Sequence, residues 1–357
     1  MRERMEKVRK IMSGKGLDGL IVTGRANTFY LSGFTGSTSY LLISMTKAWL
    51  VIDFRYTIQA RSQVCEGIEV VEHDSTFLST LDRIIADEGM ESIGFEGNNL
   101  SYSEYERFKE KLPHAGRLES IGDEIDLLRV RKDDGEIEII AEAVRLGDQV
   151  FDRVLKLVKP GIAELELAAE IEYQMRKLGA AGPSFATIVA AGERSAMCHA
   201  AASSNRIKPG DALILDFGVI YRNYCSDMTR TIFIGDPGEE MKRIYRIVRD
   251  AQLAALESLG SGMKARDADK VARDIITLEG YGACFGHSLG HGVGIEIHEE
   301  PRLSEKSEDI LLDGMVFTVE PGIYVEGLGG VRIEDMVALV DGKPRNLTCS
   351  TKEMIIL

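Results

Sequence analysis

Two stretches of the chain decide the fold: GDALILDFG at residues 210–218 and GMVFTVEPG at residues 314–322. Each begins and ends with glycine and contains an apolar run typical of a buried β-strand. Each also places a carboxylate in that run, Asp216 in the first stretch and Glu320 in the second. A carboxylate buried among apolar residues is unfavourable unless it is paired or bound to a cation. The repeated placement therefore predicts a charged site shared by two copies of one structural unit.

The resemblance between the two halves extends toward the N-terminus. PGIAELELAAEIEYQMRKLG at residues 160–179 aligns with SGMKARDADKVARDIITLEG at residues 261–280, and both patterns predict helices. A longer helix is predicted before the first of them, starting at a capping box of Asp133 and Glu136 and ending at the Pro160–Gly161 turn. Each half thus follows the order helix, helix, strand hairpin, which predicts two copies related by a pseudo-two-fold axis.

Each predicted hairpin brings in a second carboxylate. A turn near Tyr221–Arg222 would set Asp227 opposite Asp216, and a turn near Gly327 would set Glu334 opposite Glu320. The pseudo-two-fold axis then gathers all four carboxylates. Because like charges at close range oppose one another's ionisation, two divalent cations are the simplest way to balance them.

A histidine-rich segment, GHSLGHGVG, supplies a further ligand, His291. Four carboxylates and one imidazole nitrogen form an oxygen-rich set that suits manganese, with cobalt, iron or zinc as alternatives. His287 and His291 are four residues apart, but Ser288 stands where a zincin motif requires glutamate. A binuclear centre of this kind lowers the pKa of a bridging water and polarises a carbonyl.

Three more residues are candidates for roles around the metals. His199 and His298 hold nearly equivalent places in the two halves, which favours substrate binding or proton transfer over a purely structural role. Arg332 lies two residues before Glu334, on the same strand face, and is expected to orient a ligand carboxylate. The alternative for Arg332 is a surface salt bridge. Glu320 is expected to hold or transfer the proton of the nucleophile.

The first third of the chain alternates helix and strand patterns and predicts a separate α/β domain that ends near residue 123. Helices are expected over residues 2–15, 58–65, 77–88 and 102–112, and strands at LDGLIVTG (17–24), YLLIS (40–44), AWLVID (48–53) and SIGFEG (92–97).

Composition limits the class of protein. The chain has 357 residues, 44% of them hydrophobic, and a net charge of −14, which argues against nucleic-acid and anionic-membrane partners. The five cysteines form no C-x-x-C pair, and the charged N-terminus does not resemble a signal peptide. The longest apolar stretch, Tyr40 to Phe54, is too short to span a membrane. A cytoplasmic location is expected.

The motifs LDFGV-x₆-SDMTRT, GHSLGHGVG, IHEEP, TVEPGIY and GVRIED together resemble the proline-specific pita-bread metallopeptidases, aminopeptidase P and prolidase. The resemblance covers essentially the whole chain. It implies an α+β fold in which residues 124–357 form a pita-bread catalytic domain with an antiparallel sheet covered by helices. Residues 1–123 would form a smaller, creatinase-like α/β domain.

The resemblance also implies a site. The metal ligands would be Asp216, Asp227, His291, Glu320 and Glu334. The active site would be lined by His199, His287 and His298, with Arg332 supporting the ligands.

The activity that the resemblance implies is cleavage of the bond between an N-terminal residue and a following proline, by a homodimer. Two divalent metal ions, with Mn²⁺ as the first choice, would supply a bridging hydroxide that attacks the scissile carbonyl. An Xaa-Pro aminopeptidase is the main prediction and an Xaa-Pro dipeptidase the alternative. Arg55 and Tyr324 are weaker candidates for contacts with the peptide.

Other functions on the same fold remain open. Methionine aminopeptidase shares the ligand set but lacks the EPGIY and RIED pattern and the extra N-terminal domain. A metal-free creatinase-type enzyme would lack most of the ligands, and a non-catalytic binding module would have lost ligands or histidines. A purely structural role for the acidic residues must explain carboxylates in register in two apolar strands.

Overall fold

The computed structural model describes residues 2–357 and divides the chain into two compact units, Met1–Arg129 and Val130–Leu357. The division falls six residues after the boundary expected at residue 123. The short helix Asp126–Arg129 belongs with the first unit, because the amide of Asn27 donates a hydrogen bond to Asp126 (2.8 Å) and the hydroxyl of Tyr30 donates to the carbonyl of Leu128 (2.9 Å).

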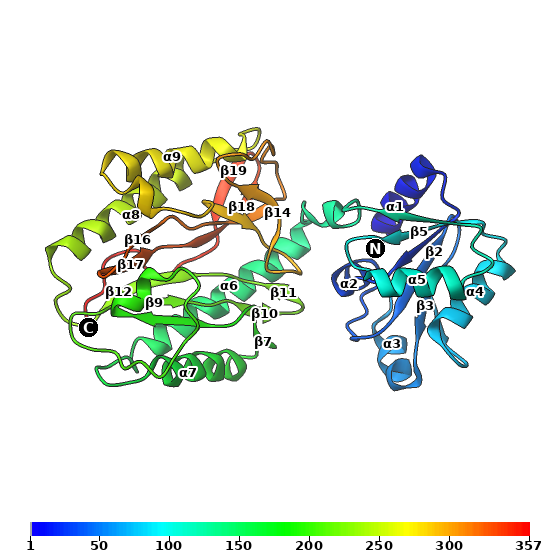
Figure 1. Cartoon of the computed structure of the whole chain (residues 1–357), viewed down its shortest axis with the longest axis horizontal. Coiled ribbons are helices and arrows are strands. Elements are labelled where there is room, and N and C mark those ends of the chain that lie inside the picture. Colours follow the sequence, from blue (N-terminus) through cyan, green and yellow to red (C-terminus); the bar gives the residue numbers. More distant parts are fainter. Residues whose placement is uncertain (1) are drawn as a thin grey trace. The chain divides into compact units, whose positions relative to one another are not determined.

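The first unit contains a six-stranded mixed sheet with helices around it (Figure 1). The strand order is β4 (Glu69–Glu72), β3 (Ala48–Ile52), β2 (Tyr40–Ser44), β1 (Gly19–Val22), β5 (Ser92–Glu96) and β6 (Arg117–Ile121). The helices are α1 (Arg2–Lys15), α2 (Arg25–Ser32), α3 (Thr57–Gln63), α4 (Phe77–Asp87) and α5 (Tyr102–Lys111).

The expected helices and strands of this unit are present, with ends within a few residues of those expected. Helix α2 and strands β4 and β6 were not expected from the sequence. They are short, and the side chains of EVVE and RLESI in the two edge strands are mostly exposed or half-buried, so the apolar pattern that marks a strand is weak there.

The second unit is built from two halves, and its strands pair antiparallel throughout the described part of the chain. The first half comprises α6 (Asp134–Val154), α7 (Glu164–Lys177), β7 (Gly182–Pro183), β8 (Ile188–Ala191), β9 (Ala212–Asp216), β10 (Val219–Tyr221), β11 (Tyr224–Cys225) and β12 (Thr229–Phe233). The second half comprises α8 (Glu239–Ser258), α9 (Ala265–Leu278), β13 (Gly290–Gly292), β14 (Glu299–Leu303), β15 (Val316–Val319), β16 (Gly322–Val325), β17 (Gly329–Arg332), β18 (Asp335–Val340) and β19 (Lys343–Asn346).

Helix α6 begins as the sequence predicts, since Asp133 and Glu136 form the capping box. It ends at Val154, several residues before the expected Pro160–Gly161 turn.

The repeat is visible in backbone contacts at the start of α7 and α9. Isolated β-bridges join Ala163 to Arg206 in the first half and Lys264 to Ile310 in the second. These residues correspond in the alignment of the two halves, so the same junction between helix and following strand is formed twice. The predicted repeat is therefore confirmed at the level of backbone hydrogen bonding.

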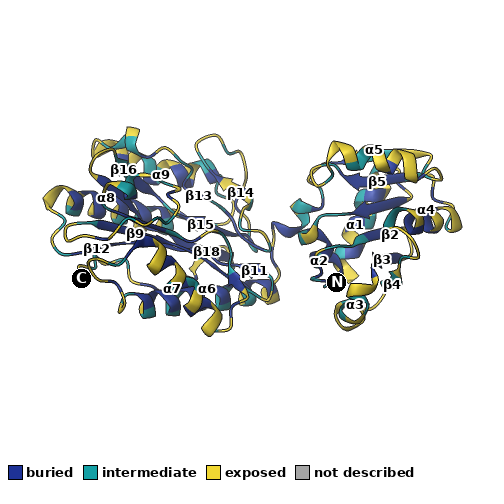
Figure 2. Cartoon of the chain, turned by 60° about the horizontal axis from the view of Figure 1, so that its bottom comes forward, coloured by how far each residue is buried: buried dark blue, intermediate teal, exposed yellow. Residues whose placement is uncertain are grey.

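Apolar packing surrounds the strands of the second unit. In Figure 1 these strands lie between α6 and α7 on one side and α8 and α9 on the other. Figure 2 shows the strands buried and the outer helix faces exposed. Strands β9, β12, β15 and β18 are buried along almost their whole length. Any charged group on them is thus held in a low-dielectric interior. Among residues 2–357, no helix combines the length and the apolar character that crossing a bilayer requires.

Candidate metal centre

The first hairpin turns one residue later than the sequence predicts. Its turn residues are Arg222 and Asn223, which have positive φ angles of 48° and 67°, as a two-residue type I′ turn requires. Strand β9 therefore pairs Asp216 with Thr229 rather than with Asp227. The expectation that Asp216 and Asp227 face each other directly was wrong. The shift equals two residues, so Asp227 stays close to Asp216 in a diagonal position.

The second hairpin has the predicted register. Val319 pairs with Asp335 on one side of the carboxylates and Gly322 pairs with Arg332 on the other. Glu320 and Glu334 therefore lie opposite each other between these two pairs.

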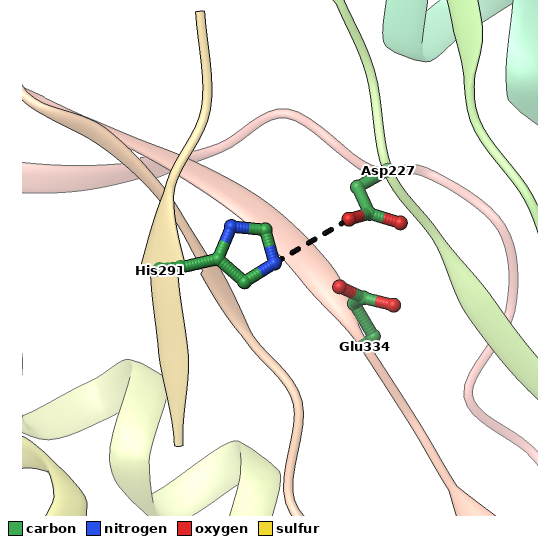
Figure 3. Close-up of side chains that lie close together, drawn as sticks. All are labelled: Asp227, His291 and Glu334. Atoms are coloured by element: carbon green, nitrogen blue, oxygen red, sulfur yellow. Dashed lines mark ion pairs between the residues drawn. The ribbon is translucent and has the colours of Figure 1, made fainter. Parts of the chain in front are cut away.

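Three of the predicted ligands form a compact group with the geometry of a cation site. One side-chain atom each from Asp227, His291 and Glu334 lies within 4.8 Å of the others. Figure 3 shows the three side chains converging: His291 from β13, Asp227 from the connection between β11 and β12, and Glu334 from the connection between β17 and β18. The Nε2 atom of His291 is 3.6 Å from Oδ2 of Asp227 and 3.4 Å from Oε1 of Glu320, so a fourth predicted ligand lies beside the same imidazole nitrogen.

Glycines flank His291 because the backbone is crowded there. A Cβ atom on Gly290 would lie 2.0 Å from the carbonyl oxygen of Thr318, and one on Gly292 would lie 2.2 Å from that of Glu300. Only glycine allows β13 to approach its neighbours this closely, and this approach brings the imidazole to the carboxylates.

Burial raises the pKa values of all four carboxyl groups, and repulsion by neighbouring carboxylates raises those of Asp227, Glu320 and Glu334 further. Burial is the largest cause in each case. The negative charges of Asp216 and Glu320 raise the pKa of Asp227 further, and those of Asp227, Glu320 and Asp216 raise that of Glu334. The pKa of Glu320 is raised to about 7. A group of carboxyls that resists ionisation in the absence of a cation matches a site built to receive one.

An unsatisfied oxygen supports the same conclusion. Oδ1 of Asp227 is buried and finds no hydrogen-bond partner among residues 2–357. The histidine is also in the form that a metal requires, because burial lowers the pKa of His291 to about 4 and leaves its imidazole neutral. Its Nδ1 lies 3.0 Å from the carbonyl of Gly292, which leaves Nε2 directed at the carboxylates.

The guanidinium of Arg332 supports two of the predicted ligands. Its Nη2 donates to Oδ2 of Asp216 at 2.5 Å, and its Nε donates to the hydroxyl of Thr229 at 3.0 Å. That hydroxyl in turn donates to Oε2 of Glu334 at 2.6 Å. Arg332 is only 4% exposed, so its ion pair with Asp216 is buried and is not the surface salt bridge considered as the alternative. Its Nη1 also donates to the hydroxyl of Tyr324 at 2.6 Å.

The three other histidines expected at the site, His199, His287 and His298, lie around this centre. Nε2 of His287 is 3.0 Å from the hydroxyl of Tyr324, and burial lowers the pKa of His287 to about 4. The rings of His291 and His298 are 4.4 Å apart between centroids. Burial lowers the pKa of His298, and nearby His199 and Arg302 lower it further. The structure thus brings the expected ligands, the expected histidines and Arg332 into one region of the second unit.

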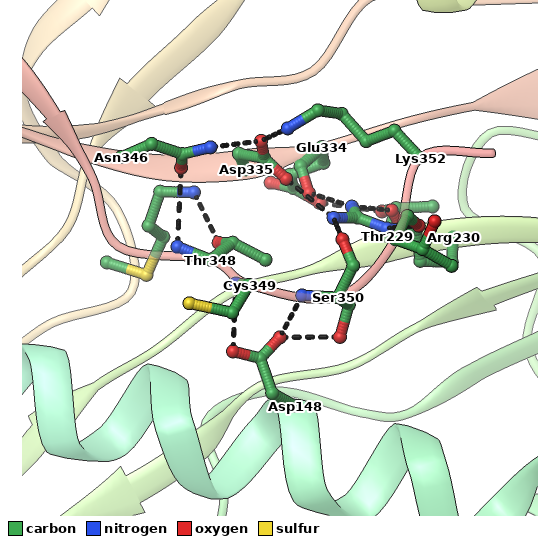
Figure 4. A network of polar contacts seen from close by, with 12 residues as sticks. Asp148, Thr229, Arg230, Glu334, Asp335, Asn346, Thr348, Cys349, Ser350 and Lys352 are labelled. Carbon is green, nitrogen blue, oxygen red and sulfur yellow. Dashed lines mark hydrogen bonds and ion pairs between the residues drawn. The ribbon is translucent and has the colours of Figure 1, made fainter.

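A second buried network binds the backbone of Glu334 and the neighbouring Asp335 (Figure 4). Arg230 is 1% exposed and donates to the carbonyl of Glu334 at 2.5 Å and to the carboxylate of Asp335 at 2.7 Å. Asp335 also accepts from Lys352 at 2.5 Å and from the amide of Asn346 at 2.8 Å. This network binds residues 350–352 to the start of β18, directly after Glu334.

Several residues of the site were missed in the sequence. Thr229 and Thr318 carry no charge, yet each donates a hydrogen bond to a ligand carboxylate. Their place on strands next to a ligand position was the signal that could have found them. Arg302 pairs with His291 across β13 and β14. Arg55, a weaker candidate, belongs to the first unit and pairs with Asp53 at 2.7 Å.

Comparison with known proteins places the chain in a family. The sequence model of metallopeptidase family M24 matches residues 138–341, and that of the creatinase/prolidase N-terminal domain matches residues 4–131. An Xaa-Pro dipeptidase from Pyrococcus furiosus is 40% identical over 357 residues, covering 99% of this chain and 100% of that protein.

Two solved structures share the whole architecture. An Xaa-Pro dipeptidase from Bacillus anthracis superposes with a TM-score of 0.97 at 42% identity, covering 100% of this chain and 99% of the other. An X-Pro aminopeptidase from Thermotoga maritima superposes with a TM-score of 0.90 at 39% identity, covering 96% and 98%.

The fold and the carboxylate–histidine centre are those of a metal-dependent hydrolase with two domains. The chain belongs to metallopeptidase family M24 and carries a creatinase/prolidase N-terminal domain. The resemblance noted from the motifs and the expected pita-bread fold are both confirmed.

Proposed function

We propose that this protein is an Xaa-Pro dipeptidase that works with two divalent metal ions. One observation supports the proposal: Asp227, His291 and Glu334 form a compact group in which one buried carboxylate oxygen of Asp227 has no partner among residues 2–357, in a chain that matches Xaa-Pro dipeptidases over its full length. The relatives favour a dipeptidase over the aminopeptidase that we expected first. The cleaved bond would join an N-terminal residue to proline.

The ions would be held by Asp216, Asp227, His291, Glu320 and Glu334. When bound there, divalent ions would supply a nucleophilic water at neutral pH and polarise the scissile carbonyl. The oxygen-rich ligand set favours manganese, with cobalt, zinc or iron as alternatives.

The protein's own groups have separate tasks in this proposal. Arg332 donates to Asp216, which orients this carboxylate and partly offsets the rise in its pKa that burial causes. Glu320 is the ligand that would hold or transfer the proton of the nucleophile. His298 is neutral near neutral pH, because burial lowers its pKa, so it can donate one hydrogen bond to the peptide. His287 is neutral as well, but its N–H faces the carbonyl of Ser288, so its Nε2 is an acceptor that holds the hydroxyl of Tyr324. His199 lies close enough to influence both of them electrostatically.

Arg302 is the residue that we propose selects dipeptides. It lies on β14 opposite His291, and its charge acts on His298. Its side chain is exposed and makes no ion pair or hydrogen bond within the described residues 2–357. A guanidinium without a partner, next to the peptide-binding histidines, is suited to bind the free carboxylate of a C-terminal proline.

Substrate length tests this assignment. Metal-stripped protein, reloaded with manganese, is offered Ala-Pro, Ala-Pro amide and Ala-Pro-Ala. We expect cleavage of Ala-Pro alone, and Arg302→Met should raise its KM by at least about tenfold. Lys306→Met, which removes an exposed positive charge four residues further along the chain, is the control and should leave KM unchanged. Equal cleavage of all three peptides would instead identify an aminopeptidase.

The expected homodimer remains a prediction. Light scattering of the purified, metal-loaded protein at several concentrations tests it, and a monomeric mass throughout would contradict it.

A further inference from the structure

The segment between residues 191 and 205 carries His199, and both of its ends are bound to one carboxylate. Glu164, the first residue of α7, is fully buried. Its Oε1 accepts from the backbone amide of Ala191 at 3.0 Å, and its Oε2 accepts from the backbone amide of Ser203 at 3.0 Å. The side chain of Asn205 donates to Oε1 at 3.0 Å. The carboxylate thus closes the base of a loop of about a dozen residues.

Arg194 extends this contact into the loop itself. Its Nε donates to both oxygens of Glu164, at 3.1 and 3.0 Å, and its Nη2 donates to the carbonyl of Ala201 at 2.6 Å. Burial raises the pKa of Glu164, but hydrogen bonds from Asn205, Ser203 and Ala191 outweigh it and hold the pKa below its ordinary value. The carboxylate is therefore charged whenever the loop is in place.

The second half of the catalytic unit forms the same backbone junction without a carboxylate. In the first half, the amide of Glu164 donates to the carbonyl of Asn205 at 3.0 Å. In the second, the amide of Ala265 donates to the carbonyl of Asp309 at 2.9 Å. Because alanine suffices at the corresponding position, the side chain of Glu164 is not required to start the helix or to align it with the following strand.

The two halves differ in how they hold the loop that follows. In the second half, the residues after His298 form strand β14, which pairs with β13 through Gly290–Leu303 and His291–Arg302. In the first half, residues 197–205 form no strand. The ladder that stabilises the loop of His298 is thus absent from the loop of His199, and the Glu164–Arg194 pair is found in its place.

A related contact holds the loop of His287. Asp269 on α9 is fully buried, and its Oδ1 accepts from the amide of Leu289 at 3.0 Å. Arg273, bound to the same carboxylate, donates to the carbonyl of His287 at 2.8 Å. A buried acidic residue on a helix, paired with an arginine, thus anchors two of the three loops that carry site histidines.

We infer that Glu164 is a positioning residue: with Arg194, it fixes the loop that presents His199 to the substrate. The inference rests on the proposed function, because it assigns His199 a role in peptide cleavage. Glu164 itself touches neither the ligand group nor the histidines.

The test combines loop mobility, kinetics and a double-mutant cycle. In Glu164→Gln, the new amide donor would face either the backbone amide of Ser203 or the donors of Ala191 and Asn205, depending on which oxygen it replaces. We expect hydrogen exchange at residues 192–203 to accelerate and kcat/KM on Ala-Pro to fall about 10–100-fold, with bound metal unchanged. Glu166→Gln, which alters an exposed carboxylate two residues along the same helix, should change neither.

Arg194→Met is a milder variant that keeps the carboxylate and its backbone donors, and it carries the test if Glu164→Gln does not fold. It should accelerate hydrogen exchange at the same backbone amides and lower kcat/KM by a smaller factor than Glu164→Gln does.

In a His199→Ala background, Glu164→Gln should lower kcat/KM no further, because both changes remove the same contribution. The inference would be overturned if the two substitutions lowered kcat/KM additively, or if hydrogen exchange at residues 192–203 were unchanged in Glu164→Gln. Failure of the wild-type protein to cleave any Xaa-Pro peptide would overturn the proposed function instead, and the exchange result would still report on the anchor.

Discussion

Removing the metal ions should leave a protein whose stability falls as pH rises from acid to neutral. The reason lies in the buried carboxyl groups of the centre. In the folded, metal-free chain the pKa of Glu320 is raised from 4.5 to about 7. The folded state therefore binds more protons than the unfolded state in this pH window, and raising the pH removes stability. Asp216, Asp227 and Glu334 act in the same direction, since their pKa values are also raised.

The size of the effect follows from Glu320 alone. A rise in pKa from 4.5 to about 7 corresponds to about 3 kcal/mol of lost stability once both states are ionised. For a unit of this length, that loss lowers the melting temperature by roughly 6–12 °C. A bound cation favours the ionised carboxylates and abolishes this loss. The difference in melting temperature between metal-loaded and stripped protein should therefore widen with pH.

Thermal unfolding of stripped and manganese-reloaded protein between about pH 5 and about pH 8 measures this difference. Stripped Glu320→Gln should show a shallower decline than stripped wild type, because its side chain cannot ionise. Glu326→Gln removes an exposed carboxylate from the adjoining hairpin turn and should behave as wild type. A difference that stays constant or narrows as pH rises would refute the electrostatic account of the centre.

Three substitutions test the supporting contacts. Thr229→Val removes the hydroxyl that donates to Glu334, and we expect affinity for manganese, measured by chelator competition, to fall about 10–100-fold. Arg332→Lys keeps the charge but not the planar donors that reach Asp216 and Thr229, so kcat/KM should fall about 10–100-fold. Asp335→Asn leaves the buried guanidinium of Arg230 without its countercharge, and urea unfolding should show a loss of about 3–5 kcal/mol. Wild-type values for any of them would contradict the assigned contact.

The second hairpin shows what sequence reasoning can predict well. Its turn is marked by a glycine-rich segment, and the apolar alternation on both sides leaves one register that buries the correct faces. Glu320 and Glu334 were therefore placed correctly. The first hairpin has no such marker, because its turn residues, Arg222 and Asn223, adopt positive φ without a glycine. A two-residue error in register followed.

The ligand set was predictable for a different reason. Charged residues in apolar strands are conspicuous, and a repeat makes coincidence less plausible. The residues that orient these ligands are less visible. Thr229 resembles an ordinary strand residue, and Arg302 resembles an exposed one. Their roles depend on which atoms meet across strands, and that depends on register.

Glu164 marks the limit of such reasoning most clearly. In the sequence it is one of two glutamates at the start of an amphipathic helix, and that position suggests nothing beyond an interaction with the helix dipole. Its binding partners lie 27 to 41 residues further along the chain and are mainly backbone amides and small polar side chains, which no pattern distinguishes. The aligned position in the second half, Ala265, gives the better argument. Where two copies of a unit share a backbone junction but only one carries a buried charge, that charge serves what is unique to its own copy, here the loop of His199.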